Sequence, residues 1–409
     1  MGSPCSVPCF SNTPGNFRGG QIADYFHFWT TLTSDFHVLS MIRGIHIDFS
    51  ASVTQCEPPK PMHYCQAQKT AVSIELNKLL DKQVVKHVTQ CEGQFISNIF
   101  LRQKKDNSHR VILNLKELNK NVKYIHFKMD TLKTALDLVT ANAWFCSVDL
   151  KDAYISLSIA PKHRKLLRFQ WEDSLFEFQC LPQGLSEAPR KFSRVLKILL
   201  AKLRSKGITI IGYLDDTLII ADTTDECSQA VTESAVLFDR AGFTVHPEKS
   251  VLSPKQEITF LGFIISSLEM TVRLTSDKKE KIMSAAHSIL SKSCLSIKQL
   301  AEFVGQLVAS EPGVPQAALH YKRLEIERDA ALKLNNRNYL NTMQLSPIAR
   351  ADVLWWRNNI EFAQRSLLTP QVDCVITSDS SSYAWGGHCE GKFAGGPWTQ
   401  WVATFTQYF

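Results

Sequence analysis

Hydrophobic positions recur along the chain with two different periods, and together they predict alternating helices and strands. Steps of three and four residues predict helices at 34–42, 72–84, 131–139, 187–206 and 225–241. Short apolar runs on either side of a polar turn predict two hairpins, 95–101 with 111–115 and 166–171 with 176–181. A third hairpin is predicted around Tyr213-Leu214-Asp215-Asp216, and the pattern becomes helical again after residue 275.

The tip of the third hairpin carries two adjacent carboxylates, Asp215 and Asp216. Keeping both ionised beside buried strands is costly, and a divalent cation offsets their repulsion. An Asp-Asp pair is equally ordinary turn chemistry, so the pair alone decides nothing. Asp149 lies upstream in a strand-like segment, which alternating apolar positions extend to residue 159. Three carboxylates on neighbouring strands suit a two-metal phosphoryl-transfer centre.

Six motifs, taken in order, resemble those of a reverse transcriptase of the retroelement type. They are a basic hairpin, Asp149, Leu181-Pro182-Gln183-Gly184, the Tyr213 tetrapeptide, Lys249 and Phe260-Leu261-Gly262-Phe263. The N-terminal flank and the stretch after residue 275 resemble most closely the DIRS-type retrotransposons. The resemblance implies an α+β, right-hand polymerase with fingers, palm and thumb, followed by a partial ribonuclease H-like α/β segment. The implied divisions are 1–60 (tail and flank), 61–270 (fingers and palm), 271–368 (thumb and helical connection) and 369–409 (truncated ribonuclease H-like segment).

The same resemblance assigns the residues of a nucleotidyltransferase centre. Asp149, Asp215 and Asp216, with the backbone carbonyl of Leu150, match the ligands of two Mg²⁺ ions, for which Mn²⁺ is a possible substitute. Lys249 matches a lysine proposed to protonate the leaving pyrophosphate, although a solvated lysine is the plain alternative. The nearby Asp152 is expected to be a structural acid.

Further residues match the family's nucleotide and primer contacts. Arg110 and either Lys104 or Lys105 match the fingers residues that grip the triphosphate, and Gln183 and Gly184 match the pocket wall. Tyr154 matches a bulky aromatic residue that crowds the sugar 2′ position, with a packed strand tyrosine as the alternative. The primer grip corresponds to Phe260, Leu261 and Gly262.

The C-terminal segment resembles the opening of a ribonuclease H domain. Asp379 lies in Ser378-Asp379-Ser380 and matches the first metal-binding acid of that domain. After it the sequence contains one further acid, Glu390, which is expected in a hairpin turn. Because that activity needs several carboxylates, we expect none in this chain and read Asp379 as vestigial.

Composition adds few constraints. The 409 residues carry a formal net charge of +7, and eight Lys or Arg against two acids between Phe100 and Lys128 favour a polyanion partner over a merely solvated face. The 11 cysteines show no zinc spacing, and no apolar run reaches the length of a membrane span, so an intracellular protein of cytoplasm or nucleus without a membrane partner is expected.

The sequence therefore predicts an RNA-directed DNA polymerase that acts on an RNA template, a DNA primer and dNTPs. The alternative from another class is a catalytically silent, nucleic-acid-binding remnant of a truncated element. An RNA-dependent RNA polymerase shares the paired acids, but neither the bulky Tyr154 nor Leu181-Pro182-Gln183-Gly184.

Overall fold

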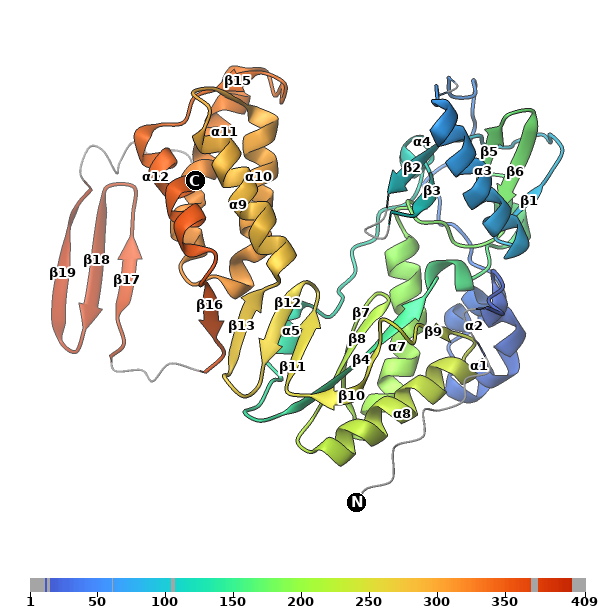
Figure 1. Ribbon diagram of the computed structural model, residues 1–409, viewed down its shortest axis with the longest axis horizontal. Coiled ribbons are helices and arrows are strands. Elements are labelled where there is room, and N and C mark those ends of the chain that lie inside the picture. The colour runs from blue at the N-terminus through green and yellow to red at the C-terminus, as the bar shows by residue number, and fades with distance from the viewer. Residues whose placement is uncertain (1–11, 13–14, 61, 104–106, 369–373, 399–409) are drawn as a thin grey trace. The chain divides into compact units, whose positions relative to one another are not determined.

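The computed structural model describes residues 12, 15–60, 62–103, 107–368 and 374–398, which belong to two compact units, 1–365 and 366–409 (Figure 1). At the centre of the first unit is an antiparallel sheet with strand order β10-β4-β8-β7. Its strands are β4 (Trp144–Lys151), β7 (Thr209–Tyr213), β8 (Asp216–Ala221) and β10 (Val251–Lys255). The short β9 (Thr244–Val245) pairs with the end of β4, through Leu150 and Lys151.

Two amphipathic helices, α7 (Ala188–Arg204) and α8 (Thr224–Arg240), pack against this sheet (Figure 1). They confirm the helices predicted at 187–206 and 225–241. The buried face of α7 repeats at three- and four-residue steps, through Phe192, Val195, Leu196, Leu199, Leu200 and Leu203. Thr223 begins α8 with a capping box, in which its hydroxyl accepts from the amide of Glu226 and the Glu226 carboxylate accepts in return.

The segment after Asp149 differs from the prediction. We expected a strand to 159, but β4 ends at Lys151 and Asp152 adopts a left-handed φ of 54°. A 3₁₀ turn (Tyr154–Ser156) follows, and the next residues make isolated bridges, Ser158 to Cys180 and Ile159 to Ile45. The alternating apolar residues therefore occupy a 3₁₀ turn and a bridging segment, in which the neighbours Ser156 and Leu157 are both fully buried.

The first unit also contains one larger helix and two small sheets, within the range 61–270 for which fingers and palm were predicted. The helix is α3 (Gln66–Asp81), and the hairpin of β2 (Ile99–Gln103) and β3 (His109–Leu113) confirms the predicted strand-turn-strand. The second small sheet has the order β1-β6-β5, from β1 (Val85–His87), β6 (Ser174–Phe178) and β5 (Arg168–Trp171). Short helices complete this region: α4 (Lys116–Asn119), α5 (Leu132–Leu136) and α6 (Pro161–Arg164).

The N-terminal flank is built into the body of this unit. It contains a 3₁₀ turn (Gln21–Tyr25), α1 (Phe26–Leu32) and α2 (Phe36–Arg43), the last confirming the helix expected near 34–42. Both α1 and α2 contact α7 (Figure 1). Trp29 is fully buried, and its indole Nε1 donates to the carbonyl of Ala241 at 3.0 Å. The flank is therefore part of the same hydrophobic core as the central sheet.

Beyond β10 the chain forms another sheet and a helical bundle. The sheet has the order β11-β12-β13-β16, with β11 (Glu257–Phe260), β12 (Phe263–Ser266), β13 (Thr271–Leu274) and β16 (Gln364–Ser366). The helices are α9 (Ser276–Leu290), α10 (Ile297–Ser310), α11 (Lys322–Leu334) and α12 (Pro347–Asn359), with a small β14 (Leu295–Ser296) and β15 (Thr342–Met343) pair. Trp356 is fully buried in α12, as expected of a core aromatic, whereas Trp355 stacks on the ring of His320.

The second unit, as far as it is described, is an antiparallel meander of β17 (Thr377–Ser380), β18 (Ala384–Cys389) and β19 (Lys392–Pro397). Its described residues contain no helix, so the α/β character expected of this segment is not seen in them. None of the helices in the described parts of the chain is long and apolar enough to cross a membrane.

Candidate active site

The three predicted carboxylates lie at one end of the central sheet. Asp149 of β4 is the register partner of Asp216 in β8, and Asp216 is also paired with Tyr213 of β7. Leu214 and Asp215 form the turn between β7 and β8, where Leu214 has a φ of 56°. A non-glycine residue in this conformation is uncommon, so the packed strands on both sides must hold the turn in place.

Backbone hydrogen bonds fix the Asp149 strand from both sides. The carbonyl of Asp215 accepts from the amide of Leu150 at 3.0 Å, which ties the turn to β4. On the other side, the carbonyl of Asp149 accepts from the amide of His246 at 2.8 Å, and its amide donates to the hydroxyl of Ser250 at 3.0 Å. The relative positions of the three acids are thus set by main-chain contacts, as a preorganised site requires.

The site is electrostatically strained in a way that favours a cation. Burial, followed by repulsion from Asp215 and Asp149, raises the pKa of Asp216 to about 6. Burial also raises the pKa of Asp149, and the positive charge of Lys249 partly offsets the effect. Burial and the charge of Asp215 likewise raise the pKa of the Tyr154 hydroxyl. All three shifts arise mainly from burial, and the neighbouring carboxylates add to each of them.

The predicted ligands suit a hard divalent cation, because all of them bind through oxygen atoms and the carboxylates of Asp149 and Asp215 repel that of Asp216. Within the described residues, however, no three His, Cys, Asp or Glu side chains are gathered closely enough to hold an ion. The assignment of Asp149, Asp215, Asp216 and the Leu150 carbonyl as metal ligands therefore stays a prediction.

A cavity of about 340 Å³ opens beside the acids and collects several predicted nucleotide residues. Asp149, Asp215, Tyr154, Arg110 and Gln183 all contribute to its lining. Within it the Arg110 guanidinium donates from Nη1 to Oε1 of Gln183 at 2.7 Å. This hydrogen bond joins strand β3 to the segment after β6 in the lining of the cavity that Asp149 and Asp215 also line.

Gly184 lies where two backbone segments come close together. Its φ is 102°, and a Cβ atom there would lie 3.1 Å from the carbonyl oxygen of Leu113 in β3. The carbonyl of Gly184 also accepts from the side-chain amide of Asn119 at 2.8 Å. A side chain at this position would push β3, and with it Arg110, away from Gln183.

Tyr154 stands at the side of the cavity. Its ring is half-buried and packs against Phe192 of α7, with ring centroids 5.1 Å apart. The Tyr154 ring can face the cavity and pack on α7 at the same time. The contact with Phe192 therefore fixes the position of the ring, but it does not decide whether Tyr154 crowds the sugar 2′ position or is only a packing residue.

The remaining predicted residues are distributed as follows. Lys249 is exposed and lines the cavity. Lys104 and Lys105 lie outside the described residues. Leu261 and Gly262 form the tight turn of the β11–β12 hairpin, with φ values of 49° and 77°, and the carbonyl of Leu261 accepts from Lys278 at 3.2 Å. None of the primer-grip residues lines the cavity.

Asp379 lies in the second unit, on β17, with its side chain exposed. Glu390 occupies the β18–β19 turn with a φ of 47° and is also exposed, as the sequence predicts.

Sequence reasoning missed several residues that line the cavity or support the strands beside it. Asp152 does act as a structural acid, but its partner, Lys82 at 2.7 Å, was not foreseen. His246 lines the cavity, and its buried Nδ1 has no hydrogen-bond partner among the described residues. Gln21 is buried and donates through Nε2 to the carbonyl of Gly242 at 2.8 Å and to the hydroxyl of Thr244 at 3.2 Å. A glutamine in an N-terminal segment gives no sequence signal for such a role.

Comparison with known proteins identifies the central part of the chain. Residues 102–265 match the family model described as reverse transcriptase (RNA-dependent DNA polymerase). The Gag-Pol polyprotein of avian reticuloendotheliosis virus is 30% identical over 174 residues, which are 40% of this chain and 15% of that protein. The Gag-Pol polyprotein of koala retrovirus is 27% identical over 208 residues, 49% of this chain and 12% of that protein. The chain thus spans less than a sixth of the length of these relatives.

Solved structures extend the likeness of the fold to almost the whole chain. The foamy viral protease-reverse transcriptase dRH in complex with double-stranded DNA aligns with a TM-score of 0.65 and 18% identity, covering 97% of this chain and 70% of that one. The foamy viral protease-reverse transcriptase in complex with an RNA/DNA hybrid aligns with a TM-score of 0.63 and 18% identity, covering 99% of this chain and 57% of that one. Residues 102–265 of this chain are accordingly similar to reverse transcriptase domains, including those of retroviral Gag-Pol polyproteins, and the chain has a mixed α+β fold of the same kind as the solved foamy viral structures.

Proposed function

We propose that the chain is an active RNA-directed DNA polymerase that extends a DNA primer with dNTPs on an RNA or DNA template. The observation that carries the proposal is the pairing of Asp149 with Asp216 beside a cavity where Arg110 contacts Gln183. A non-catalytic remnant would not be expected to keep Asp149, Arg110 and Gln183 together around one cavity.

In this proposal each side chain has a separate task. Arg110 binds the triphosphate through its planar, doubly donating guanidinium, and Gln183 holds that guanidinium in position. Tyr154 excludes a 2′-hydroxyl from the sugar position. Lys249 supplies positive charge, and a proton, on the side where pyrophosphate leaves.

Asp149, Asp215, Asp216 and the Leu150 carbonyl would hold Mg²⁺, or Mn²⁺ in its place. When bound, the ions supply activation of the primer 3′-hydroxyl and neutralisation of the triphosphate charge. The raised pKa values of Asp149 and Asp216 support this assignment, because a bound cation would offset both the burial and the mutual repulsion that raise them.

We further propose that the chain comes from a retrotransposon, of the DIRS type by its flank and helical connection, and that the meander holding Asp379 is the beginning of a ribonuclease H-like domain. The integration of residues 17–43 into the core is compatible with a flank that belongs to the polymerase itself. Under this proposal the second unit does not cleave RNA, because Asp379 and Glu390 are both exposed and lie apart on a strand and a turn.

Primer extension tests the proposed activity directly. The full chain is incubated with an RNA template, a DNA primer, Mg²⁺ and either dNTPs or NTPs. Extension with dNTPs supports the proposal, extension with NTPs alone indicates an RNA polymerase, and primer-template binding without extension indicates a silent remnant.

A further inference from the structure

A second cavity, larger than the catalytic one, lies on the other side of the same fingers elements. Its volume is about 660 Å³, and no residue lines both cavities. In two segments, adjacent residues contribute to different cavities. Leu79 and Phe178 line the catalytic cavity, whereas their neighbours Leu80 and Gln179 line the second one. The second cavity is therefore separated from the nucleotide site by the end of α3 and by the segment that follows β6.

The lining of this second cavity is strongly cationic. It contains four positively charged side chains, Arg18, Arg43, Lys86 and Arg164, against one carboxylate, Asp24. Asp24 is already paired with Arg18. Across the residues that the structure describes, neither Arg43 nor Arg164 has a carboxylate within ion-pair distance. Two guanidinium charges thus face the same space without a counter-ion from the protein.

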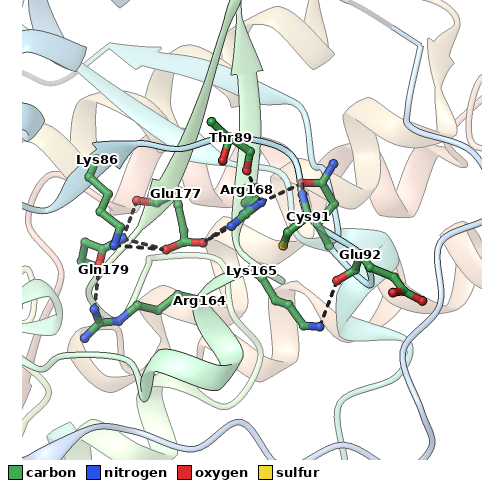
Figure 2. Close-up of polar contacts among 10 residues, drawn as sticks. Lys86, Thr89, Cys91, Glu92, Arg164, Lys165, Arg168, Glu177 and Gln179 are labelled. Carbon is green, nitrogen blue, oxygen red and sulfur yellow. Dashed lines mark hydrogen bonds and ion pairs between the residues drawn. The ribbon is translucent and has the colours of Figure 1, made fainter.

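Arg164 is held in a fixed orientation by neutral groups. Its Nε donates to the carbonyl of Ile159 and its Nη1 to Oε1 of Gln179, both at 2.8 Å. Gln179 in turn donates from Nε2 to the carboxylate of Glu177 at 3.1 Å, and Glu177 forms a buried ion pair with Arg168 at 2.7 Å. Figure 2 shows this chain of contacts running from Arg168 to Arg164.

The arrangement orients Arg164 without neutralising it. The charge of Glu177 is taken up by Arg168, and what reaches Arg164 is the amide oxygen of Gln179. Arg43 is similarly fixed, because its guanidinium carbon lies 4.1 Å from the centre of the Phe26 ring. Lys86 lies beside them, 3.9 Å from Glu177 and 54% exposed. Guanidinium groups with fixed positions and uncompensated charge are suited to bidentate recognition of phosphate.

We propose that this cavity is a second anion site, which binds a phosphate group carried by a free polyphosphate or by a nucleic-acid strand. Arg43 and Arg164 bind the phosphate oxygens, and Lys86 adds charge at the rim. The site is distinct from the catalytic cavity, because the two linings share no residue.

The test uses the full chain carrying Arg110→Gln, which weakens triphosphate binding at the catalytic cavity. Inorganic tripolyphosphate is titrated calorimetrically without Mg²⁺. We expect binding to persist in Arg110→Gln and to weaken about tenfold with added Arg43→Gln, since a charge-assisted contact is lost. Added Lys86→Gln is expected to weaken it about threefold, because an exposed charge contributes less.

Lys206→Gln is the matched control. Lys206 is 52% exposed and paired with Glu233, and it does not line either cavity. It therefore removes the same unit charge, from a side chain of similar exposure, without touching the site. If Lys86→Gln and Lys206→Gln weaken tripolyphosphate binding equally, the binding depends only on net charge and the proposal is overturned. Loss of all tripolyphosphate binding in Arg110→Gln alone would also overturn it, because the ligand would then bind only at the catalytic cavity.

A second arm separates the two sources of phosphate. Primer-templates with single-stranded 5′ overhangs of increasing length are bound to the parent chain and to Lys86→Gln and Arg43→Gln. If the site binds a strand, the variants lose affinity beyond a threshold overhang length. If it binds free polyphosphate, the variants lose affinity for tripolyphosphate but bind primer-templates of every overhang length as the parent does. No response to either probe would contradict the site.

Discussion

Asp149 and Asp216 face each other across the antiparallel strands β4 and β8, so two carboxylates share one end of a buried sheet. In the metal-free protein this proximity destabilises the ionised form of Asp216. Burial and the neighbouring carboxylates raise the pKa of Asp216 to about 6. A carboxyl group with a folded pKa above its unfolded value binds more protons in the folded state. The free energy of unfolding should therefore fall as pH rises from about 4 to about 6.

This relationship makes the first prediction. Asp216→Asn should stabilise the metal-free chain at pH 7 by about 1 kcal/mol, a value reduced from the full linkage energy because the site is partly exposed to solvent. The gain should shrink as pH falls and be gone near pH 3, below the unfolded pKa of 3.8, where Asp216 is protonated in both the folded and the unfolded state. Urea denaturation at the two pH values in a chelating buffer measures it. A variant that is less stable than the parent at pH 7 would show that Asp216 is well compensated by the protein.

The second prediction concerns the contact between Arg110 and Gln183. Arg110→Lys keeps the charge but loses the planar fork, so the KM for dNTP should rise about tenfold while kcat changes little. Gln183→Ala should give a smaller increase, and the double variant should be less impaired than the sum of the two, because they share one hydrogen bond. Steady-state kinetics of all four proteins measures this coupling. Strict additivity would mean that the two side chains act separately.

Sugar selection provides the third prediction. Tyr154→Ala should open the space beside the 2′ position and lower the preference for dNTP over NTP by about ten- to a hundredfold, since the clash of an overpacked group costs about 1–3 kcal/mol. Tyr154→Phe keeps the ring and its packing on Phe192, and it should preserve the preference. The ratio of kcat/KM for the two nucleotides is the measurement. An unchanged ratio in Tyr154→Ala would leave Tyr154 as a packing residue.

The fourth prediction tests the support from the N-terminal flank. Gln21→Leu leaves the carbonyl of Gly242 and the hydroxyl of Thr244 without their donor, next to the strand β9 that pairs with the end of β4. We expect about 1–3 kcal/mol of lost stability and a lower kcat with unchanged affinity for primer-template.

A buried polar residue that lacks this connection serves as the control. Ser234→Ala removes a hydroxyl that bonds to Ala230 within α8. The two variants are compared at temperatures where each is equally folded. If Ser234→Ala lowers kcat as much as Gln21→Leu does, the effect is general loss of stability and the flank has no positioning role.

The parts of the fold that the sequence predicts best are those specified by local periodicity. The helices α7 and α8 and the hairpin at Tyr213 follow directly from their own residues. The strand predicted after Lys151 was wrong because apolar residues that alternate in the sequence do not guarantee a strand, and here a left-handed φ at Asp152 and a 3₁₀ turn follow β4. Here the loop lies between Ile45 and Cys180, which are distant in sequence.

The site shows the same division between local and long-range information. Asp215 and Asp216 are recognisable because they are adjacent and their flanking strands are local, whereas Asp149 lies far upstream and is recognised through its own strand and the order of the motifs. The supporting contacts join residues far apart in the chain, such as Lys82 with Asp152 and Gln21 with Thr244. Periodicity carries no information on such pairs, and they emerge only when the helices and strands pack together.

The most direct test of the account is primer extension by Asp215→Asn. The substitution keeps the size of the side chain and removes one negative charge from the turn between β7 and β8. We expect DNA synthesis on an RNA template to fall more than about a hundredfold, because even the loss of an outer-shell partner of a metal commonly costs 10- to 100-fold. Thermal unfolding and primer-template affinity should stay close to those of the parent. Near-normal extension by a folded Asp215→Asn protein would contradict the assignment of these acids as the catalytic centre.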